Sequence, residues 1–301
     1  LRADTFYNST DAEVTRGVAG VKFTNPHLFD TDLRFTQDFR YQRVERITQE
    51  FDLDQYSFAN FVHHTWKQPV RLSLGHTLAQ ENITNVEPDV VLSDLDSGVL
   101  NLSYISANID YDGRDDVFNP TSGYTFGLES RALAEVIGAE ADVLTLGGRF
   151  AYLLPLDSTR RFVFANNYRV RAAWTLGDTP AVPITQRLYL GGRNSVRGYR
   201  ENSLGPLGEA GHVIGGDFLT QANFELRMRI TETLQALSFV DLGTVYLRDK
   251  ETSFGNLRKG AGAGLRYLSP IGPIGFDLGT PLDERSGEPS LRFHFSIGGS
   301  F

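Results

Sequence analysis

The feature of this sequence that most restricts its fold is an alternation of apolar and polar residues that continues through most of the chain. In FVFANNYRVRAAW (162–174), one parity carries side chains such as Phe164, while the other carries Arg169 and Arg171. FLTQANFELRMRI (218–230) repeats the pattern. Successive side chains of a β-strand point to opposite faces, so this period of two predicts strands with one apolar and one polar face.

About fourteen such segments follow one another, joined by turns rich in Gly, Pro, Asn and Asp. No helix longer than a turn or two is needed, and no linker divides the chain, so we predict one all-β domain over residues 1–301. In 99–111 the apolar parity shifts partway, which predicts a β-bulge. The predicted strands are 1–8, 14–24, 33–42, 51–66, 70–80, 99–111, 124–134, 142–154, 162–175, 218–230, 234–247, 261–269, 273–281 and 290–301.

Two architectures offer one apolar face per strand. A soluble sandwich or barrel turns that face inward, whereas a transmembrane barrel turns it toward lipid and lines its lumen with the polar face. In the clearest strands every charged residue lies on the polar parity, as Arg34, Asp38 and Arg40 do in the segment 33–42. Because so many strands share one aromatic-rich face, we predict a transmembrane antiparallel β-barrel.

Composition excludes several classes of protein. A formal net charge of −8 argues against nucleic-acid binding, and the absence of cysteine excludes disulfides and thiolate metal sites. No apolar run approaches the length of a transmembrane helix. The opening LRADTFYNST lacks a signal-peptide pattern. If the protein is exported, we therefore expect this sequence to be a mature or trimmed piece of it.

Four motifs in order carry a family resemblance: DGRDDVFNPTSGY (112–124), GGRNSVRGY (191–199), GAGLRYLSPIGPIGFDLGTPL (262–282) and LRFHFSIGGSF (291–301). Together they resemble the BamA/TamA family of outer-membrane assembly proteins, which includes the two-partner secretion transporters. That resemblance implies a barrel of sixteen strands, with GGRNSVRGY in a long extracellular loop folded back into the lumen.

Five predicted strands follow the GGRNSVRGY loop, as in the family, but only nine precede it. We therefore expect this chain to hold strands 3–16 of a sixteen-stranded barrel, with two strands and the periplasmic POTRA repeats lying upstream. The alternative is a true fourteen-stranded barrel.

The resemblance also implies which residues fasten the loop. The loop arginine corresponds to Arg197, and its acidic partners correspond to Glu225 and Asp241. Both acids fall on the lumen parity that the alternation assigns independently. A guanidinium in a confined polar lumen gains from bidentate bonds to carboxylates, so we expect a latch between loop and barrel wall.

Neighbouring loop residues support that latch. Gly191, Gly192 and Gly198 permit turns that other residues disfavour, and Tyr199 can anchor the loop by packing and a hydroxyl bond.

At the other end of the motif series, the C-terminal strand resembles an assembly signal of outer-membrane proteins. Its residues are Phe293, Phe295, Ile297 and Phe301.

Other motifs do not predict chemistry. DYDGRDD (110–116) has the carboxylates of a calcium loop but not its final glutamate, and a turn explains it better. His63 and His64 lie on opposite faces of one strand and cannot bind one metal together. KGAGAG (259–264) precedes a strand rather than a helix, so we expect no phosphate site there. Its small residues are instead expected to leave space in the lumen for the folded-in loop. We predict no catalytic, cofactor or metal residues and no enzyme.

The resemblance implies insertion or translocation of other proteins at the bacterial outer membrane, without nucleotide or cofactor. The expected partners are membrane lipids, unfolded outer-membrane proteins or autotransporters, and accessory lipoproteins or a periplasm-spanning partner. The alternatives are a two-partner secretion pore for one dedicated exoprotein, the barrel of a fused enzyme, and a passive porin.

Overall fold

A computed structural model of the chain describes residues 2–8, 14–46, 51–66, 69–248, 257–269, 272–285, 288 and 290–297. Its strands form a single antiparallel sheet in which each pairs with the next along the chain. The strands are β1 (Arg2–Asn8), β2 (Val14–Asn25), β3 (Leu33–Arg46), β4 (Phe51–Trp66), β5 (Val70–Thr84), β6 (Gly98–Asp112), β7 (Gly123–Leu133), β8 (Val143–Pro155), β9 (Phe162–Thr175), β10 (Phe218–Arg229), β11 (Leu234–Tyr246), β12 (Arg258–Ser269), β13 (Gly272–Pro281) and β14 (Arg292–Ile297).

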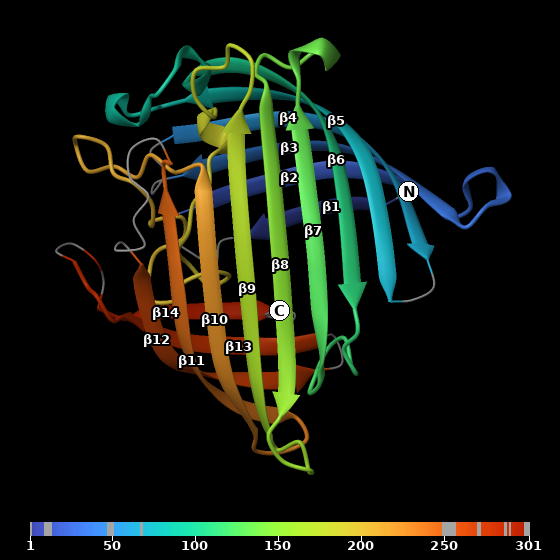
Figure 1. The fold of residues 1–301 in the computed structure, drawn as a ribbon, viewed down its shortest axis with the longest axis vertical. Coiled ribbons are helices and arrows are strands. Elements are labelled where there is room, and N and C mark those ends of the chain that lie inside the picture. The colour runs from blue at the N-terminus through green and yellow to red at the C-terminus, as the bar shows by residue number, and fades with distance from the viewer. Residues whose placement is uncertain are drawn as a thin grey trace.

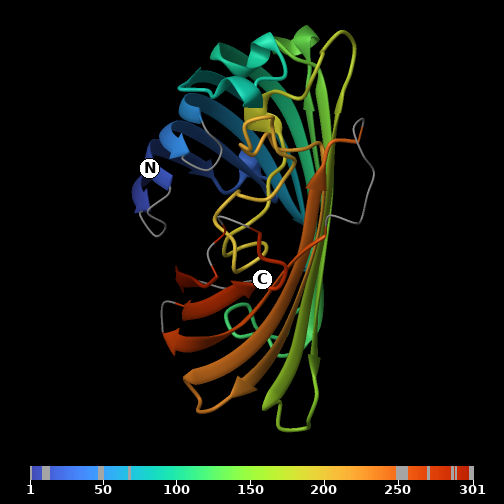
Figure 2. The same ribbon diagram turned by 90° about the vertical axis from the view of Figure 1, so that its left-hand side faces the viewer.

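The sheet curls into the wall of a barrel (Figure 1, Figure 2). Within the described residues β1 pairs only with β2, and β14 only with β13. Because neighbours are antiparallel, the loops after odd-numbered strands share one end, which includes the long loop 176–217. Longer loops mark the extracellular end of such barrels, and we call it the outer end. No helix among the described residues has the length and apolar character to span a bilayer.

The fourteen strands correspond one to one with the predicted segments, so the all-β antiparallel barrel fold is confirmed. The largest difference at a strand start is in β12, which begins at Arg258 rather than 261. The five short 3-10 turns, η1 (Leu28–Asp30), η2 (Pro88–Val90), η3 (Asp94–Asp96), η4 (Glu135–Ile137) and η5 (Ile184–Gln186), all lie in connections between strands.

The two faces of the wall have the predicted polarities. On β10 and β14 the apolar side chains of Leu226 and Phe293 point outward and are 42% and 58% exposed. On the inner face, the side chains of Glu225 and Asp241 are fully buried. An apolar belt outside and a polar interior are what a barrel surrounded by lipid requires, because the bilayer offers no partners to polar groups.

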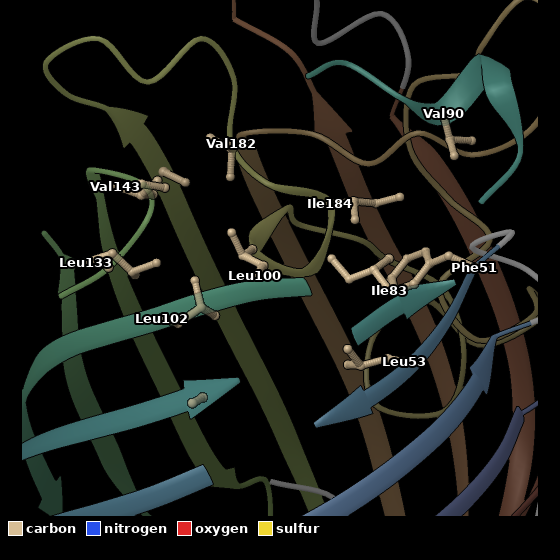
Figure 3. Close-up of a cluster of buried hydrophobic side chains, with 14 of the residues drawn as sticks. Phe51, Leu53, Ile83, Val90, Leu100, Leu102, Leu133, Val143, Val182 and Ile184 are labelled. Carbon is tan, nitrogen blue, oxygen red and sulfur yellow. The ribbon is translucent and has the colours of Figure 1, made fainter. Parts of the chain in front are cut away.

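At the outer end this polarity reverses. Apolar side chains from the inner faces of β4, β5 and β6, including Phe51, Leu53 and Ile83, pack with Val90 and Ile184 of the loops above them (Figure 3). We call this group the outer-end core. The residues alternating with them point outward and are polar, among them Asp52, Asp54, Asn82 and Thr84. These strand ends are therefore built like a water-soluble protein, with an apolar inside and a polar outside.

This reversal corrects the bulge predicted in β6. The β5–β6 register runs without interruption from Val70 opposite Tyr111 to Ile83 opposite Gly98. Leu100 and Leu102 point inward into the outer-end core, whereas Ile105 and Ile109 point outward and are 46% and 44% exposed. The apolar parity changes because the surroundings change along the strand, and the backbone does not slip.

Candidate functional site: the loop inside the barrel

The segment 176–217 connects β9 to β10 and folds back along the concave side of the sheet (Figure 2). Bridges between Leu188 and Gly216 and between Leu190 and Leu204 pair its two arms. Leu188, Leu190 and Leu204 pack with Tyr199 and with wall residues in a second buried apolar cluster. The loop therefore carries its own core and presents its tip to the lumen wall.

The first anchor of the loop was not predicted from the sequence. Arg187 forms an ion pair with Asp96 of η3, and the two side chains are 1% and 0% exposed. Arg187 also donates to the carbonyls of Val90 (2.8 Å) and Ile214 (3.0 Å), while Asp96 accepts from the backbone N–H of Ile184 (2.7 Å). This pair joins the base of the loop to the β5–β6 connection beside the outer-end core.

Gly191 and Gly192 turn the chain at the start of the motif. Their φ angles are 108° and 89°, in the left-handed region that favours glycine. A side chain on Gly191 would lie 2.2 Å from the carbonyl oxygen of Arg200, on the returning arm. The Gly191 N–H donates to the Ser195 hydroxyl over 2.8 Å, which closes the turn.

Arg197 lies at the centre of the site, with its side chain 4% exposed. Its Nη1 donates to Glu225 Oε1 at 2.7 Å, while Nε and Nη2 donate to the two carboxylate oxygens of Asp241 at 2.8 and 2.9 Å. The Arg197 backbone N–H adds a fourth bond, 3.0 Å to Asp241. The guanidinium carbon also lies 3.6 Å from the centre of the Phe239 ring, within range of a cation–π interaction. The structure thus brings together the three residues expected to form the latch.

Further charged residues complete the cluster. Arg227 binds the second oxygen of Glu225 at 2.8 Å, and Arg266 holds Asp277 through two bonds of 2.6 and 2.8 Å. Asp277 in turn lies 3.5 Å from Arg197. The alternation placed these residues on the lumen parity, but only the strand register brings them beside Arg197. Three carboxylates thus face three arginines in a site largely closed to solvent. Pairing each charge with an opposite one lowers the cost of burying it.

Small residues in the wall let the loop approach this closely. A side chain on Gly260 of β12 would lie 2.0 Å from the Arg197 carbonyl oxygen, and one on Gly279 would lie 2.7 Å from the Gly198 nitrogen. Gly198 itself has a φ of 104°. The prediction that the glycines of 259–264 make room for the loop is confirmed at Gly260.

Tyr199 is 1% exposed and fixes the next point of the loop. Its hydroxyl donates to Asp283 at 2.6 Å, and the Arg258 guanidinium lies 4.7 Å from its ring centre. Burial and the bond to Asp283 raise the pKa of the Tyr199 phenol above its usual range. Burial works against ionisation of Asp283, but its bonds to Tyr199, to the Lys259 backbone and to Arg258 lower its pKa. The phenol therefore stays protonated and acts as a donor.

The predicted assembly-signal residues lie on β14. The side chains of Phe293 and Ile297 point outward and are 58% and 61% exposed, and the Phe276 ring contacts both Phe293 and Phe295. Phe301 lies outside the described residues. One loop residue reaches this strand, because Arg193 Nη1 donates to the Phe295 carbonyl oxygen at 2.7 Å.

Two of the motifs set aside in the sequence have structural roles. In the turn 113–122, Asp115 accepts the backbone N–H groups of Thr121 (2.9 Å) and Ser122 (3.0 Å) and pairs with Arg160 of the next turn (2.7 Å). His63 is hydrogen-bonded to the hydroxyl of Ser73 at 2.8 Å. In the part of the chain that the structure describes, no three His, Asp or Glu side chains are grouped to hold a metal ion.

The site is thus built for fastening a loop, and comparisons with known proteins agree on what kind of barrel carries it. The outer membrane protein assembly factor BamA of Nitratidesulfovibrio vulgaris is 28% identical over 296 residues, which cover 93% of this chain. A crystal structure of BamA from Haemophilus ducreyi lacking POTRA domains 1–3 superimposes with a TM-score of 0.82 at 20% identity, covering 94% of this chain and 62% of that one. CdiB from Acinetobacter baumannii gives a TM-score of 0.50 at 14% identity, covering 99% of this chain and 59% of that one.

This chain spans 36% of the length of the N. vulgaris relative. The Omp85 superfamily domain matches residues 8–301, which is nearly all of the sequence. The apolar belt, the strand order and these relatives agree on a barrel of the bacterial outer membrane. The chain belongs to the Omp85 superfamily.

Proposed function

We propose that this barrel inserts other proteins into the outer membrane, or translocates them across it, and uses neither a nucleotide nor a cofactor. The observation that carries the proposal is the fastening of the long loop inside the lumen by Arg197, on a barrel whose curated relative is an outer-membrane protein assembly factor. A passive porin needs an open path through its lumen, whereas here the loop fills part of it. The substrates are unfolded outer-membrane proteins or autotransporters, which accessory lipoproteins or a periplasm-spanning partner deliver.

The loop acts as a latch in this proposal. Arg197 ties it to β10 through Glu225 and to β11 through Asp241, and Tyr199 ties it to Asp283 beyond β13. The loop therefore braces the strands that lead to β14. The lipid beside β14 is then disturbed at a seam, and a substrate strand enters the membrane there. In this proposal residues 1–301 form one barrel domain, with POTRA repeats upstream.

Reconstitution tests the function and the latch separately. Vesicles holding the intact protein are expected to speed the folding of an added unfolded outer-membrane protein, scored by its electrophoretic mobility without heating, relative to empty vesicles. Equal rates would overturn the function. Arg197→Ala is expected to remove most of the gain, whereas Arg40→Ala, which changes a more exposed pair with Asp38, is expected to keep it. A folded Arg197→Ala protein at full rate would overturn the latch alone.

The similarity to CdiB favours a second candidate, a secretion pore for one dedicated exoprotein. The same vesicles distinguish the two, because a secreted substrate reaches the vesicle interior in soluble form, whereas an inserted one stays in the membrane.

We also propose that the outward aromatics of β14, with Phe301, form an assembly signal. Deletion of Phe301 is then expected to slow insertion of this barrel more than it lowers the stability of the folded form. Assembly at the normal rate would count against that role.

A further inference from the structure

Below the latch, the lumen holds a cavity of about 580 Å³ that extends from Arg197 and Glu225 toward Pro69 and Arg71 at the periplasmic end of β5. A second hollow of about 400 Å³ adjoins it and shares Arg149 and Arg169. Neither hollow is filled by the loop. Of the latch residues, only Arg197 and Glu225 line the larger cavity, and the rest of its lining takes no part in the latch.

The walls of the two hollows are rich in arginine, although the chain as a whole has a formal charge of −8. Each carboxylate on these walls already has an arginine partner, so the remaining cations set the local charge. The pairs are Asp110–Arg149 at 2.5 Å, Asp112–Arg114 at 2.7 Å, Glu129–Arg171 at 2.6 Å and Glu225–Arg197 at 2.7 Å.

Arg169 is one of these remaining cations. It lies on the inner face of β9, directly opposite Arg149 of β8, with Arg171 two residues further along its own strand. Among the described residues, no carboxylate lies within ion-pairing distance of Arg169. Like charges directly opposite each other on one face of a sheet are unfavourable, so an anion between them would relieve a repulsion that the wall itself creates.

The neighbouring wall keeps space for such an anion. Gly127 lies opposite Arg149, and a side chain there would come 2.5 Å from the arginine Nε. Gly147 lies opposite Arg171, and a side chain there would come 2.4 Å from the Glu129 carboxylate. Because these positions carry no side chain, the arginines and their partners lie along the wall, and the centre of the hollow stays open.

From the loop side, Arg193 also lines the larger cavity. Its Nη1 bonds the Phe295 carbonyl, and among the described residues no carboxylate pairs with it. The planar guanidinium has several N–H donors, so one bond to a carbonyl leaves others for a ligand. Arg169 and Arg193 thus reach the same cavity from the barrel wall and from the loop.

We propose that this cavity is a binding site for an oxyanion, a phosphate or a carboxylate group, held by Arg169 with Arg149 and Arg193. Guanidinium groups match the geometry of both anions through paired charge-assisted bonds. The cavity extends to Pro69 and Arg71 at the periplasmic end of β5, so it can take either a free phosphate ion or an acidic side chain of a polypeptide in the lumen.

Calorimetric titration of the intact protein in detergent with inorganic phosphate, at constant ionic strength, tests the site. Arg169→Gln is expected to weaken phosphate binding by at least about tenfold, as loss of a charge-assisted bond implies. The matched control Arg40→Gln, an arginine of β3 outside both hollows, is expected to bind as the unmodified protein does. Electrophoretic mobility without heating confirms that each variant is folded.

If Arg169→Gln does not fold, Arg193→Gln provides the second variant, since it removes a cation from the loop side, and it is expected to weaken binding as well. Hexaglutamate then separates the two sources of the anion. Its displacement of phosphate assigns the site to acidic polypeptide, and its failure to do so assigns the site to a free ion. Absence of phosphate binding to the unmodified protein, or equal binding by folded Arg169→Gln, overturns the proposal.

Discussion

Arg187 and Asp96 are 91 positions apart in the sequence and form an ion pair that solvent barely reaches. We expect Asp96→Ala to lower the free energy of unfolding by about 3–5 kcal/mol, because it leaves the Arg187 charge buried without its partner. The matched change Asp38→Ala breaks a more exposed pair with Arg40 and is expected to cost about 0–1 kcal/mol. Denaturant titration of both variants in detergent measures the difference, and equal costs would show that the buried pair anchors nothing.

The latch is a second testable unit. Arg197→Ala and Glu225→Ala are each expected to destabilise the barrel and expose the loop to protease, since both remove the same buried ion pair. The double variant is then expected to be more stable than additivity predicts, by about 0.5–3 kcal/mol. A double-mutant cycle on unfolding measures this coupling. Strict additivity, with the loop equally protected in every variant, would rule out the latch.

The orientation of the wall predicts a difference between its two faces. Leu226→Arg and Phe293→Arg place a charge on the outward face and are expected to cost about 2–4 kcal/mol near the bilayer midplane. Asn167→Arg adds the same side chain on the inner face, where Asn167 bonds Asn223, and is expected to cost less. Folding in liposomes provides the measurement, and equal costs on both faces would contradict the lipid-facing assignment.

Close approach of loop and wall predicts that Gly260 cannot be enlarged. Gly260→Ala sets a methyl group against the Arg197 carbonyl and is expected to cost about 1–3 kcal/mol through displacement of the loop. The control Gly148→Ala places the same group 3.8 Å from its nearest neighbour, Leu128. Protease sensitivity of the loop is expected to rise in the first variant alone, and a rise in both would remove the steric explanation.

The turn after β6 predicts an acid-sensitive contribution to stability. Burial disfavours the charged form of Asp115, but the hydrogen bonds from Thr121 and Ser122 lower its pKa from 3.8 to about 2. A carboxyl whose pKa is depressed by folding stabilises the protein above its unfolded pKa, and that contribution disappears as the pH falls from 3.8 toward 2. Unfolding followed across this window is expected to show a smaller pH dependence in Asp115→Asn than in the unmodified protein, and identical profiles would refute the assignment.

Alternation predicted the strands because a period of two reports directly which side chains share a face. It also placed Glu225 and Asp241 on the inner face, where the structure has them. It misjudged β6, since it assumed one environment per face, whereas Leu100 and Leu102 lie where the inside has become apolar. The pair between Arg187 and Asp96 was beyond its reach, because both residues lie in connections, where no periodicity constrains the chain.

The outer-end core has a consequence for the direction in which this barrel can travel. Around it, strand ends present Asp52, Asp54 and Asn82 outward, as a collar suited to water and not to hydrocarbon. If the folded barrel moved back toward the periplasm, these polar side chains would enter the acyl chains of the bilayer. There each unpartnered polar group costs several kcal/mol. Once the outer-end core has formed, it therefore opposes retreat of the wall toward the periplasm.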